Sequence, residues 1–228
     1  MRVIVTGASR GIGLELCRQL AGRGDQVVAG ARRPAEASEL RRVAGEVAGR
    51  ITVLPLDVAS EESVRSFGGL LTQPVDVLIN NAGVVGKMGA FPELDFTDLQ
   101  ATYGTNALGP LRVASAALAA LRQGDAKKIV NVSTGMASLA DNTSGGAWGY
   151  RMAKAALNMA TRNLALALGK EGFVCVAVNP GWVKTDMGGA GATMAVEESA
   201  ARILRIVDTL DATKNGSFLN HDGNAFPW

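Results

Sequence analysis

The sequence predicts a single α/β domain, built on a doubly wound and mostly parallel sheet of about seven strands with helices on both faces. Short apolar runs alternate with longer helical patterns, the order expected for parallel strands joined by helical crossovers. The runs are rich in β-branched residues and almost continuously apolar, as strands covered on both faces are. The 228 residues contain no repeat or linker that would divide them, so we expect one domain over residues 1–228.

The predicted elements follow one another along the whole chain. Strands are expected at 3–5, 26–29, 51–56, 75–79, 128–132 and 174–178, with a final edge strand at 218–219. Helical patterns occupy 12–21, 61–71, 96–121 and 150–168. Because open α/β sheets bind ligands at the carboxyl ends of their strands, polar residues that follow these strands are the first candidates for a site.

The composition excludes several classes of protein. Lys and Arg total 23 against 21 for Asp and Glu, so the net charge of +2 indicates no nucleic-acid partner. Cys17 and Cys175 are interpreted as buried thiols, and with the single His221 they are too few ligands for a metal site. The apolar run at 3–5 is too short for a signal peptide or a membrane span. We therefore expect a cytoplasmic protein with no metal and no membrane partner.

A glycine-rich turn follows the first strand and opens the first helix. Its sequence, TGASRGIG, has the spacing GxxxGxG from Gly7 through Gly11 to Gly13. Glycines permit a tight turn and a close approach of the backbone to a ligand, and the helix N-terminus offers unpaired N–H groups with a partial positive charge. The turn therefore predicts a site for a pyrophosphate.

The end of the second strand carries arginines where an NAD site usually has an acidic residue. Arg32 follows that strand, and Arg10 in the glycine turn lies on the same side of the fold. A guanidinium can donate two hydrogen bonds to phosphate oxygens, as the 2′-phosphate of NADP requires. NADP(H) is therefore the preferred cofactor, with NAD(H) possible, although Arg32 and Arg33 could also be solvated loop charges.

Two further strands end in polar residues. Asp57 follows the third strand, where its carboxylate could accept from an adenine amino group or cap the helix that starts near Ser60. Asn81 begins the sequence NAG after the fourth strand and fits either a ligand contact or a simple loop.

Tyr150 and Lys154 are the sharpest catalytic candidates. Residues four apart share one face of a helix, so the phenol and the ammonium can lie together. A free phenol has a pKa of about 10, and a nearby cation lowers it towards the range useful for acid–base catalysis. Ser133 and Thr134 end the fifth strand and could polarise a carbonyl. Asn106 lies inside a long helical pattern, which suggests a hydrogen-bonding role or a local distortion.

These motifs occur in the order typical of short-chain dehydrogenases/reductases, and the chain resembles that family over residues 3–187, roughly four-fifths of its length. TGASRGIG, Asp57, NNAG, Asn106, Ser/Thr, YxxxK and PGWVKTD carry the resemblance. The motifs YRMAKAALNM and PGWVKTDMGG are similar to the branch that contains C-factor and sniffer-type carbonyl reductases. The resemblance implies a Rossmann fold, with a cofactor half at about 1–110 and a catalytic and substrate half at about 111–228.

The resemblance also implies roles for individual residues. Tyr150 would act as general acid/base, Lys154 would hold the ribose and lower the phenol pKa, and Asn106 would support a proton relay. Thr134 falls on the position of the usual catalytic serine, with Ser133 as the alternative one residue earlier. The implied cofactor-binding residues are Gly7, Ser9, Arg10, Gly11, Ile12, Gly13, Arg32, Asp57, Val58, Asn81, Ala82, Gly83, Tyr150, Lys154, Pro180, Gly181, Val183 and Thr185.

The substrate is predicted only as a small carbonyl compound or alcohol. Selectivity is expected from 86–91, 135–147 and 187–196, the last as either a mobile lid or a surface loop, while Trp148 and Trp182 could line a pocket or belong to the core. Two alternatives stay open: alcohol oxidation as the working direction, and an NADP-binding signalling or redox-sensing protein with little turnover. The family resemblance also implies a homodimer or homotetramer formed through the long helices at 96–121 and 150–168.

Overall fold

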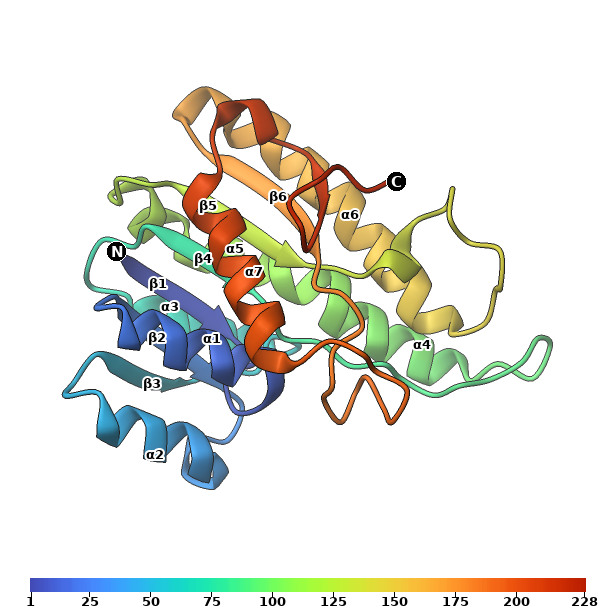
Figure 1. Ribbon diagram of the computed structural model, residues 1–228, viewed down its shortest axis with the longest axis horizontal. Helices are drawn as coiled ribbons and strands as arrows, with labels where there is room; N and C mark the ends of the chain where they lie inside the picture. Colours follow the sequence, from blue (N-terminus) through green and yellow to red (C-terminus); the bar gives the residue numbers. More distant parts are fainter.

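One parallel sheet of seven strands runs through the molecule, with the order β3-β2-β1-β4-β5-β6-β7. The computed structural model describes residues 1–228 (Figure 1). The strands are β1 Arg2–Thr6, β2 Gln26–Ala31, β3 Ile51–Pro55, β4 Val77–Asn80, β5 Lys128–Val132, β6 Val174–Asn179 and β7 Phe218–Asn220. Because the order reverses between β1 and β4, the crevice beyond these two strands is the topological switch point of the sheet.

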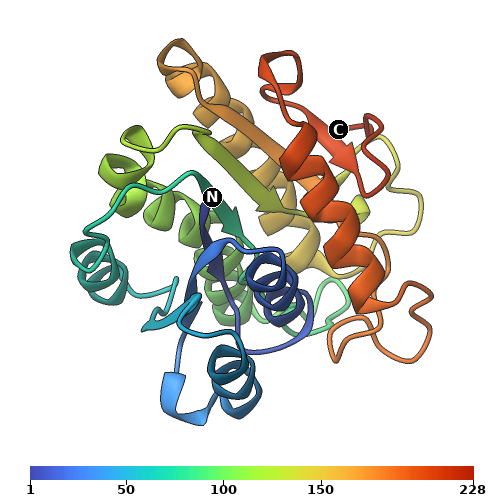
Figure 2. The same cartoon turned by 60° about the vertical axis from the view of Figure 1, so that its left-hand side comes forward.

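Helices cover both faces of the sheet, as predicted. They are α1 Gly11–Gly22, α2 Ser38–Glu46, α3 Glu61–Gly69, α4 Phe96–Tyr103, α5 Gly109–Arg122, α6 Trp148–Leu168 and α7 Val196–Thr209. Buried side chains of α1, α2 and α7 pack on one face, and those of α3, α5 and α6 pack on the other (Figure 2).

The alternation of side chains along β1 explains the two hydrophobic cores. Val3 and Val5 face α1 and α7, whereas Ile4 between them faces α3 and α5, and all three are fully buried. Successive side chains of a strand point to opposite faces, so a strand covered on both faces must be apolar at every position. The doubly wound sheet predicted from the continuous apolar runs is therefore confirmed.

Three features differ from the sequence-based prediction. The helical pattern at 96–121 divides into α4 and α5, joined by a π-helical turn at Gly104–Leu108 that contains Asn106. The strand expected to start at 75 begins at Val77. The helices α2 and α7 were not among the predicted ranges, although Ile203 and Val207 of α7 are fully buried against the sheet.

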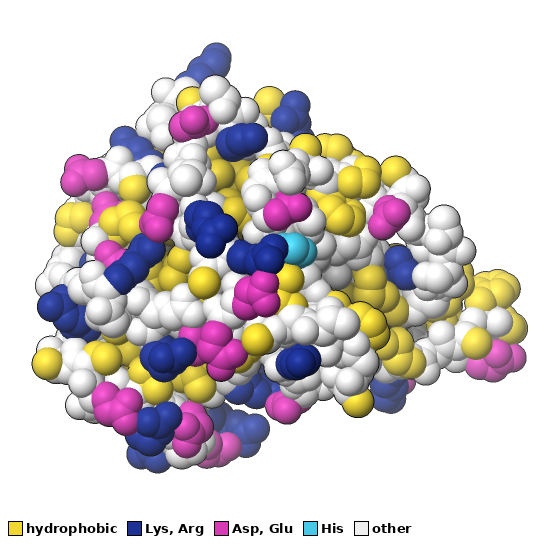
Figure 3. Space-filling model, viewed as in Figure 1, with side chains coloured by type: hydrophobic (Ala, Val, Ile, Leu, Met, Phe, Trp, Pro, Cys, Tyr) yellow, Lys and Arg dark blue, Asp and Glu magenta, His cyan; other side chains and the backbone are white.

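Charges of both signs are mixed on the face of the molecule that carries α1 and α7 (Figure 3). Several of them pair between elements, as Arg23 after α1 does with Asp208 of α7 at 2.8 Å. Arg202 of α7 lies 2.7 Å from Glu198 and 2.7 Å from the ring of His221, the one cyan side chain in Figure 3. The mixture on this face agrees with the small net charge of the whole chain.

Both cysteines are buried and unpaired, as predicted for Cys17 in α1 and Cys175 in β6. Burial raises the pKa of each thiol to about 12, which leaves both in the unreactive protonated form. None of the helices combines the length and the apolar character that crossing a membrane requires.

Candidate active site

The predicted site residues gather at the carboxyl edge of the central strands. β1, β4, β5 and β6 are neighbours in a parallel sheet, so the segments that follow them leave from the same edge (Figure 1). Three of these segments, 81–95, 133–147 and 180–195, surround the space beyond the strands, while the glycine turn after β1 closes one side.

The glycine turn holds the N-terminus of α1 open to this space. Gly7 and Gly11 have φ angles of +65° and +55°, which side chains rarely adopt. A Cβ atom on Gly13 would collide with the Gly7 carbonyl, so the turn and the helix need glycine to pack this closely. No side chain caps α1, and its first turn contains no acidic residue. Its first N–H groups are therefore left for an external anion.

Thr6 joins the glycine turn to the segment after β4, and it was not among the predicted site residues. Its hydroxyl oxygen accepts from the N–H groups of Asn81 and Ala82, at 3.0 Å each. Asn81 Nδ2 in turn donates to the Thr6 carbonyl oxygen at 3.0 Å. These bonds use the backbone N–H and the Nδ2 group of Asn81. The predicted contacts of Asn81 with a ligand can therefore involve only its remaining polar groups. A threonine directly before the first glycine was the signal available in the sequence.

The two predicted phosphate-binding arginines have different surroundings. Arg32 is exposed directly after β2 and takes part in no ion pair, whereas its neighbour Arg33 pairs with Glu36 at 2.9 Å. Arg10 Nη1 lies 2.6 Å from Asp186 Oδ2 in the segment after β6. Arg32 is therefore the guanidinium available to an external phosphate, while Arg10 is engaged across the mouth of the site.

The structure excludes the capping alternative for Asp57. Ser60 caps α3, because its hydroxyl oxygen accepts from Ser63 N–H at 3.2 Å. Asp57 Oδ1 instead accepts from Ala59 N–H at 3.0 Å in a local turn. The side chain of Val58 is buried against Gly109, where a Cβ would lie 2.9 Å from Val58 Cγ2. Only the backbone of Val58 can therefore face a ligand.

Tyr150 and Thr134 are the first two residues of the candidate catalytic group. Tyr150 lies in the first turn of α6, and Thr134 follows β5. Burial raises the pKa of the Tyr150 phenol, and the nearby hydroxyl of Thr134 opposes that rise. Thr134 Oγ1 also accepts from Met136 N–H at 3.2 Å, which fixes the hydroxyl at the start of the following turn. A protonated phenol and a hydroxyl thus lie together.

Lys154 lies one helical turn beyond Tyr150 on the same face of α6. Its ammonium is buried and donates to the Val132 carbonyl oxygen at 2.6 Å. Burial without a partner carboxylate lowers the pKa of Lys154 from 10.5 to about 8. The helix therefore carries a cation one turn from Tyr150, and the charge of this cation depends on pH in the neutral to alkaline range.

Asn106 connects the π-helical turn to the segment after β4. Its Oδ1 accepts from Val84 N–H at 2.9 Å, and its Nδ2 donates to the Val84 carbonyl oxygen at 2.7 Å. A Cβ on Gly83 would lie 3.2 Å from Asn106 Oδ1 and 3.6 Å from Lys154 Nζ, so the three residues are in one cluster. The position thus has both the hydrogen bonding and the distortion that the sequence suggested, and both bonds of the side chain go to Val84.

Ser133 does not join this cluster. Its hydroxyl is buried and donates to Asn158 Oδ1 at 2.7 Å, deeper along α6. Adjacent residues of an extended strand point to opposite sides, so Ser133 and Thr134 cannot both face Tyr150. The structure brings Thr134 to the phenol and places Ser133 in the interior.

The segment after β6 forms the last side of the space beyond the strands. Gly181 has a φ of +86°, Val183 is buried, and Val183 pairs with Met194 in an isolated β-bridge. Thr185 Cγ2 would lie 3.3 Å from a Cβ on Gly11, so this wall meets the glycine turn directly. Residues 182–194 are therefore a closed loop held at both ends, and Trp182 on it is exposed rather than part of the core.

The glycine turn at the switch point of a parallel sheet and the Tyr–Lys spacing on α6 together define the class of fold and site. The family model described as short chain dehydrogenase matches residues 1–195. The chain therefore belongs to the short-chain dehydrogenase/reductase family, as the order of its motifs predicted.

Relatives narrow this assignment. C-signal of Myxococcus xanthus is 49% identical over 166 residues, 72% of this chain and 100% of that protein. The carbonyl reductase Sniffer of D. melanogaster has a TM-score of 0.93 at 30% identity, covering 100% of this chain and 99% of that one. The NADPH-bound carbonyl reductase from chicken fatty liver has a TM-score of 0.93 at 32% identity, covering 100% and 98%. The chain is thus an oxidoreductase of the C-factor and sniffer type.

Proposed function

We propose that this protein is an NADP(H)-dependent carbonyl reductase in which Tyr150 is the general acid. The observation that carries the proposal is the position of the Thr134 hydroxyl near the Tyr150 phenol, with the buried ammonium of Lys154 one helical turn away. A protonated acid, a second hydrogen-bond donor and a cation are the three groups that a developing alkoxide needs.

The fit of the cofactor is supported by the glycine turn. The uncapped N-terminus of α1 suits the pyrophosphate, because its free N–H groups and partial positive charge favour an anion. Arg32 suits a 2′-phosphate, since it is exposed, unpaired and without a neighbouring acid that would prefer a ribose hydroxyl. The carbonyl reductase from chicken fatty liver holds NADPH in its crystal structure, which agrees with this choice.

The proposed roles follow from the positions of the groups. When bound, the nicotinamide supplies the hydride that reduces the carbonyl carbon. Tyr150 Oη gives its proton to the carbonyl oxygen, and the Thr134 hydroxyl donates a hydrogen bond to the same oxygen. Lys154 stabilises the phenolate left on Tyr150 until a proton from solvent restores it. Because burial raises the pKa of Tyr150, the phenol is protonated at neutral pH and can serve as the acid that reduction needs.

The test is consumption of NADPH, with NADH in parallel, across aldehydes, ketones and quinones. Turnover that needs NADPH and disappears in Tyr150→Phe is the expected result. Equal use of NADH would contradict the role given to Arg32, and turnover that persists in Tyr150→Phe would contradict the acid.

A signalling role is the second candidate, favoured by the 49% identity to C-signal. It predicts tight NADPH binding with no turnover of any carbonyl or alcohol in the panel. Binding measured by calorimetry beside the activity assay separates the two candidates.

A further inference from the structure

A short 3₁₀ turn directly after Thr134 fixes the position of its hydroxyl. The turn spans Gly135–Ala137, and Thr134 Oγ1 accepts from Met136 N–H at 3.2 Å. Because the oxygen accepts this bond, the hydroxyl proton remains available to a substrate oxygen. The segments that hold the turn therefore also hold the hydrogen-bond donor.

The first half of the turn is bonded to the sheet and to α6. Gly135 N–H donates to Asn179 Oδ1 at the end of β6 at 3.0 Å, and Arg151 Nη1 donates to the Met136 carbonyl oxygen at 3.1 Å. No hydrogen bond from the sheet or from a helix reaches residues 137–143. The end of the turn therefore depends on another segment.

That segment is the tail, which we define as residues 225–228. The Trp228 carbonyl oxygen accepts from Ala140 N–H at 3.0 Å and from the buried Ser138 hydroxyl at 3.2 Å. The tail thus supplies every hydrogen bond that joins residues 137–143 to another part of the chain.

The tail is itself anchored on β7. Phe226 N–H donates to the Phe218 carbonyl oxygen at 2.8 Å, so the chain doubles back beside the strand (Figure 2). The Phe218 ring is buried, and its centroid lies 5.1 Å from that of Phe226 and 5.5 Å from that of Trp228. A Cβ on Gly135 would lie 3.2 Å from Phe226 Cζ, so this ring also covers the start of the turn. The tail therefore joins β7 to the turn after Thr134.

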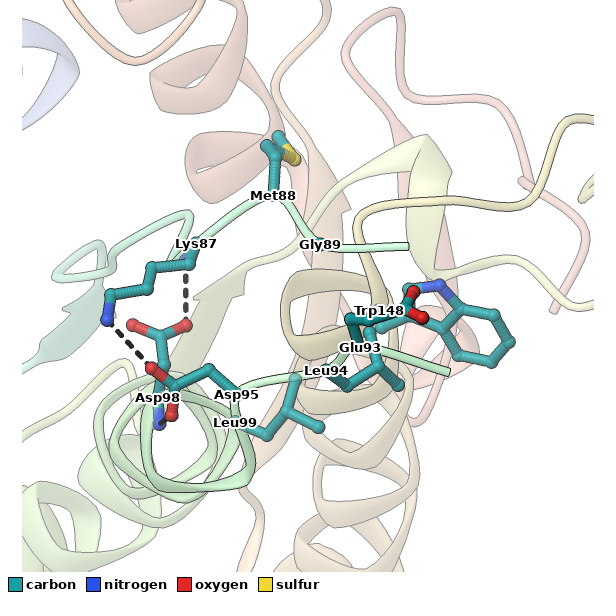
Figure 4. A pocket seen from close by; sticks show the side chains of 9 residues that line it. All are labelled: Lys87, Met88, Gly89, Glu93, Leu94, Asp95, Asp98, Leu99 and Trp148. Carbon is teal, nitrogen blue, oxygen red and sulfur yellow. Dashed lines mark hydrogen bonds and ion pairs between the residues drawn. The ribbon is translucent and has the colours of Figure 1, made fainter. Parts of the chain in front are cut away.

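Tyr150 is held from another side. Gly149 beside it packs on α4, because a Cβ there would lie 2.9 Å from Leu99 Cδ2. Leu99 and Trp148 line a hollow of about 130 Å³ between the segment after β4, α4 and the first turn of α6 (Figure 4). No residue of the tail or of the turn lines this hollow. Loss of the tail should therefore disturb Thr134 and leave Tyr150 in place.

We propose that Phe226 and Trp228 are positioning residues, which hold the turn after Thr134 and direct its hydroxyl towards the reacting carbonyl. A catalytic group misplaced by about 1 Å can cost about 10²-fold in rate, so even a partial loss of this hold should lower kcat. The inference rests on the proposed carbonyl reductase function, because that function assigns the Thr134 hydroxyl to the substrate oxygen.

The first test removes the Trp228 ring, which packs on Phe218. In Trp228→Ala we expect kcat for the reduction of 4-nitrobenzaldehyde by NADPH to fall about tenfold, since one aromatic contact shifts an equilibrium by up to about tenfold. The KM for NADPH should stay within about twofold, and hydrogen exchange of the Ala140 amide should become faster. Trp228→Phe, which keeps a ring against Phe218, should restore both kcat and slow exchange. Ser138→Ala removes the other partner of the same bond and should change kcat in the same direction.

The second test asks whether the tail acts through Thr134. In the Thr134→Val background, Trp228→Ala should lower kcat further by less than about twofold, because the hydroxyl that the tail positions is already absent. A tail that only stabilised the fold would lower kcat by the same factor in both backgrounds. That result would overturn the proposal.

Val207→Ala is the control for lost stability. Val207 is fully buried near the end of α7, and its carbonyl oxygen accepts from Lys128 Nζ at the start of β5, at the edge of the sheet opposite the site. The substitution should lower the urea midpoint at least as much as Trp228→Ala and leave kcat within about twofold of the wild type. A loss of kcat in this control as large as in Trp228→Ala would overturn the positioning role.

Hydrogen exchange at Ala140 distinguishes this inference from the proposed function. Unchanged exchange in Trp228→Ala would overturn the inference, as would faster exchange with unchanged kcat in an active enzyme, and both results leave the reductase intact. If the wild type reduces no carbonyl compound, faster exchange in Trp228→Ala would support the hold on the turn while the reductase is overturned. Unchanged exchange in a protein without turnover would overturn both.

Discussion

Ser133 Oγ donates a 2.7 Å hydrogen bond to Oδ1 of Asn158, eight residues beyond Tyr150 on the same helix. The Asn158 side chain has no other partner, because its buried Nδ2 finds no acceptor. This pair therefore fixes α6 against β5 below the site, while the next residue, Thr134, turns towards the phenol. Of these two adjacent hydroxyls, Ser133 therefore has a structural position and Thr134 faces the candidate catalytic group.

The first prediction separates these two hydroxyls. Ser133→Ala should lower the free energy of unfolding by about 1–3 kcal/mol, because Asn158 would be left without any hydrogen bond in the interior. Its kcat with NADPH should stay within about twofold of the wild type. Thr134→Val, which keeps the β-branch, should lower kcat about 10²–10³-fold, the cost of removing one donor to a developing oxyanion. Urea denaturation and steady-state kinetics measure both effects, and an inactive Ser133→Ala beside an active Thr134→Val would reverse the assignment.

The second prediction concerns the stability of the cofactor-free protein at alkaline pH. The pKa of Lys154 falls from 10.5 to about 8 on folding, so between these values the unfolded chain binds more protons than the native one. The free energy of unfolding should therefore rise with pH between these two values. Below pH 8 the native protein must bury a charged ammonium, and there the cost of burial is greatest. Across this pH window the free energy of unfolding should increase by about 3 kcal/mol, because each unit of pKa shift corresponds to about 1.36 kcal/mol.

Lys154→Met provides the comparison for this pH dependence. The difference in unfolding free energy between wild type and variant should move in favour of the wild type from pH 7.5 to 10. Tyr150 does not disturb the comparison, since burial raises its pKa above the ordinary value of 10. Parallel stability curves for the two proteins would show that the Lys154 ammonium is not depressed by burial.

Local patterns predicted the elements of this fold and most of its site. Val3, Ile4 and Val5 are apolar without interruption because both faces of β1 are covered, and that is visible in the sequence alone. Gly13 and the pair of Tyr150 and Lys154 could equally be predicted from the sequence, since each depends on spacing within one turn or one helix. These are the parts of the site whose geometry is set by neighbours along the chain.

Contacts between distant segments could not be predicted in this way. The Arg10–Asp186 ion pair joins residues 176 positions apart, and nothing local marks either partner. Alternation along the strand predicted that only one of Ser133 and Thr134 faces the site, and the family resemblance, rather than any local pattern, assigned that position to Thr134. At the π-helical turn the side chain of Asn106 bonds to Val84, 22 residues earlier in the chain, and the sequence indicated a distortion there without its form.

The third prediction tests the choice of cofactor. Arg32→Gln should raise the KM for NADPH about 10–100-fold and leave the KM for NADH nearly unchanged, because a hydrogen bond to a charged group contributes about 1.5–3 kcal/mol. Arg33→Gln is the control, since that guanidinium already pairs with Glu36. The NADPH effect should weaken with added salt, as expected for an exposed phosphate contact. Equal effects of both substitutions would contradict a specific role for Arg32.

The fourth prediction concerns association of two copies through α4, α5 and α6. Of the apolar side chains on α6, Leu157 and Leu168 are buried in the core, whereas Met159 is 63% exposed. Met159, Tyr103 and Leu111 line a shallow groove of about 390 Å³ whose walls are almost entirely apolar.

An apolar groove shared by the long helices suits a two-fold contact, in which each copy presents the same surface to the other. We expect a dimer by light scattering, and we expect Met159→Glu to shift it to a monomer without unfolding, because the side chain is exposed in the single chain. Met152→Glu is the control, since Met152 is 58% exposed on α6 and does not line the groove. A wild-type protein that scatters as a monomer at all concentrations would show that this groove does not join two copies.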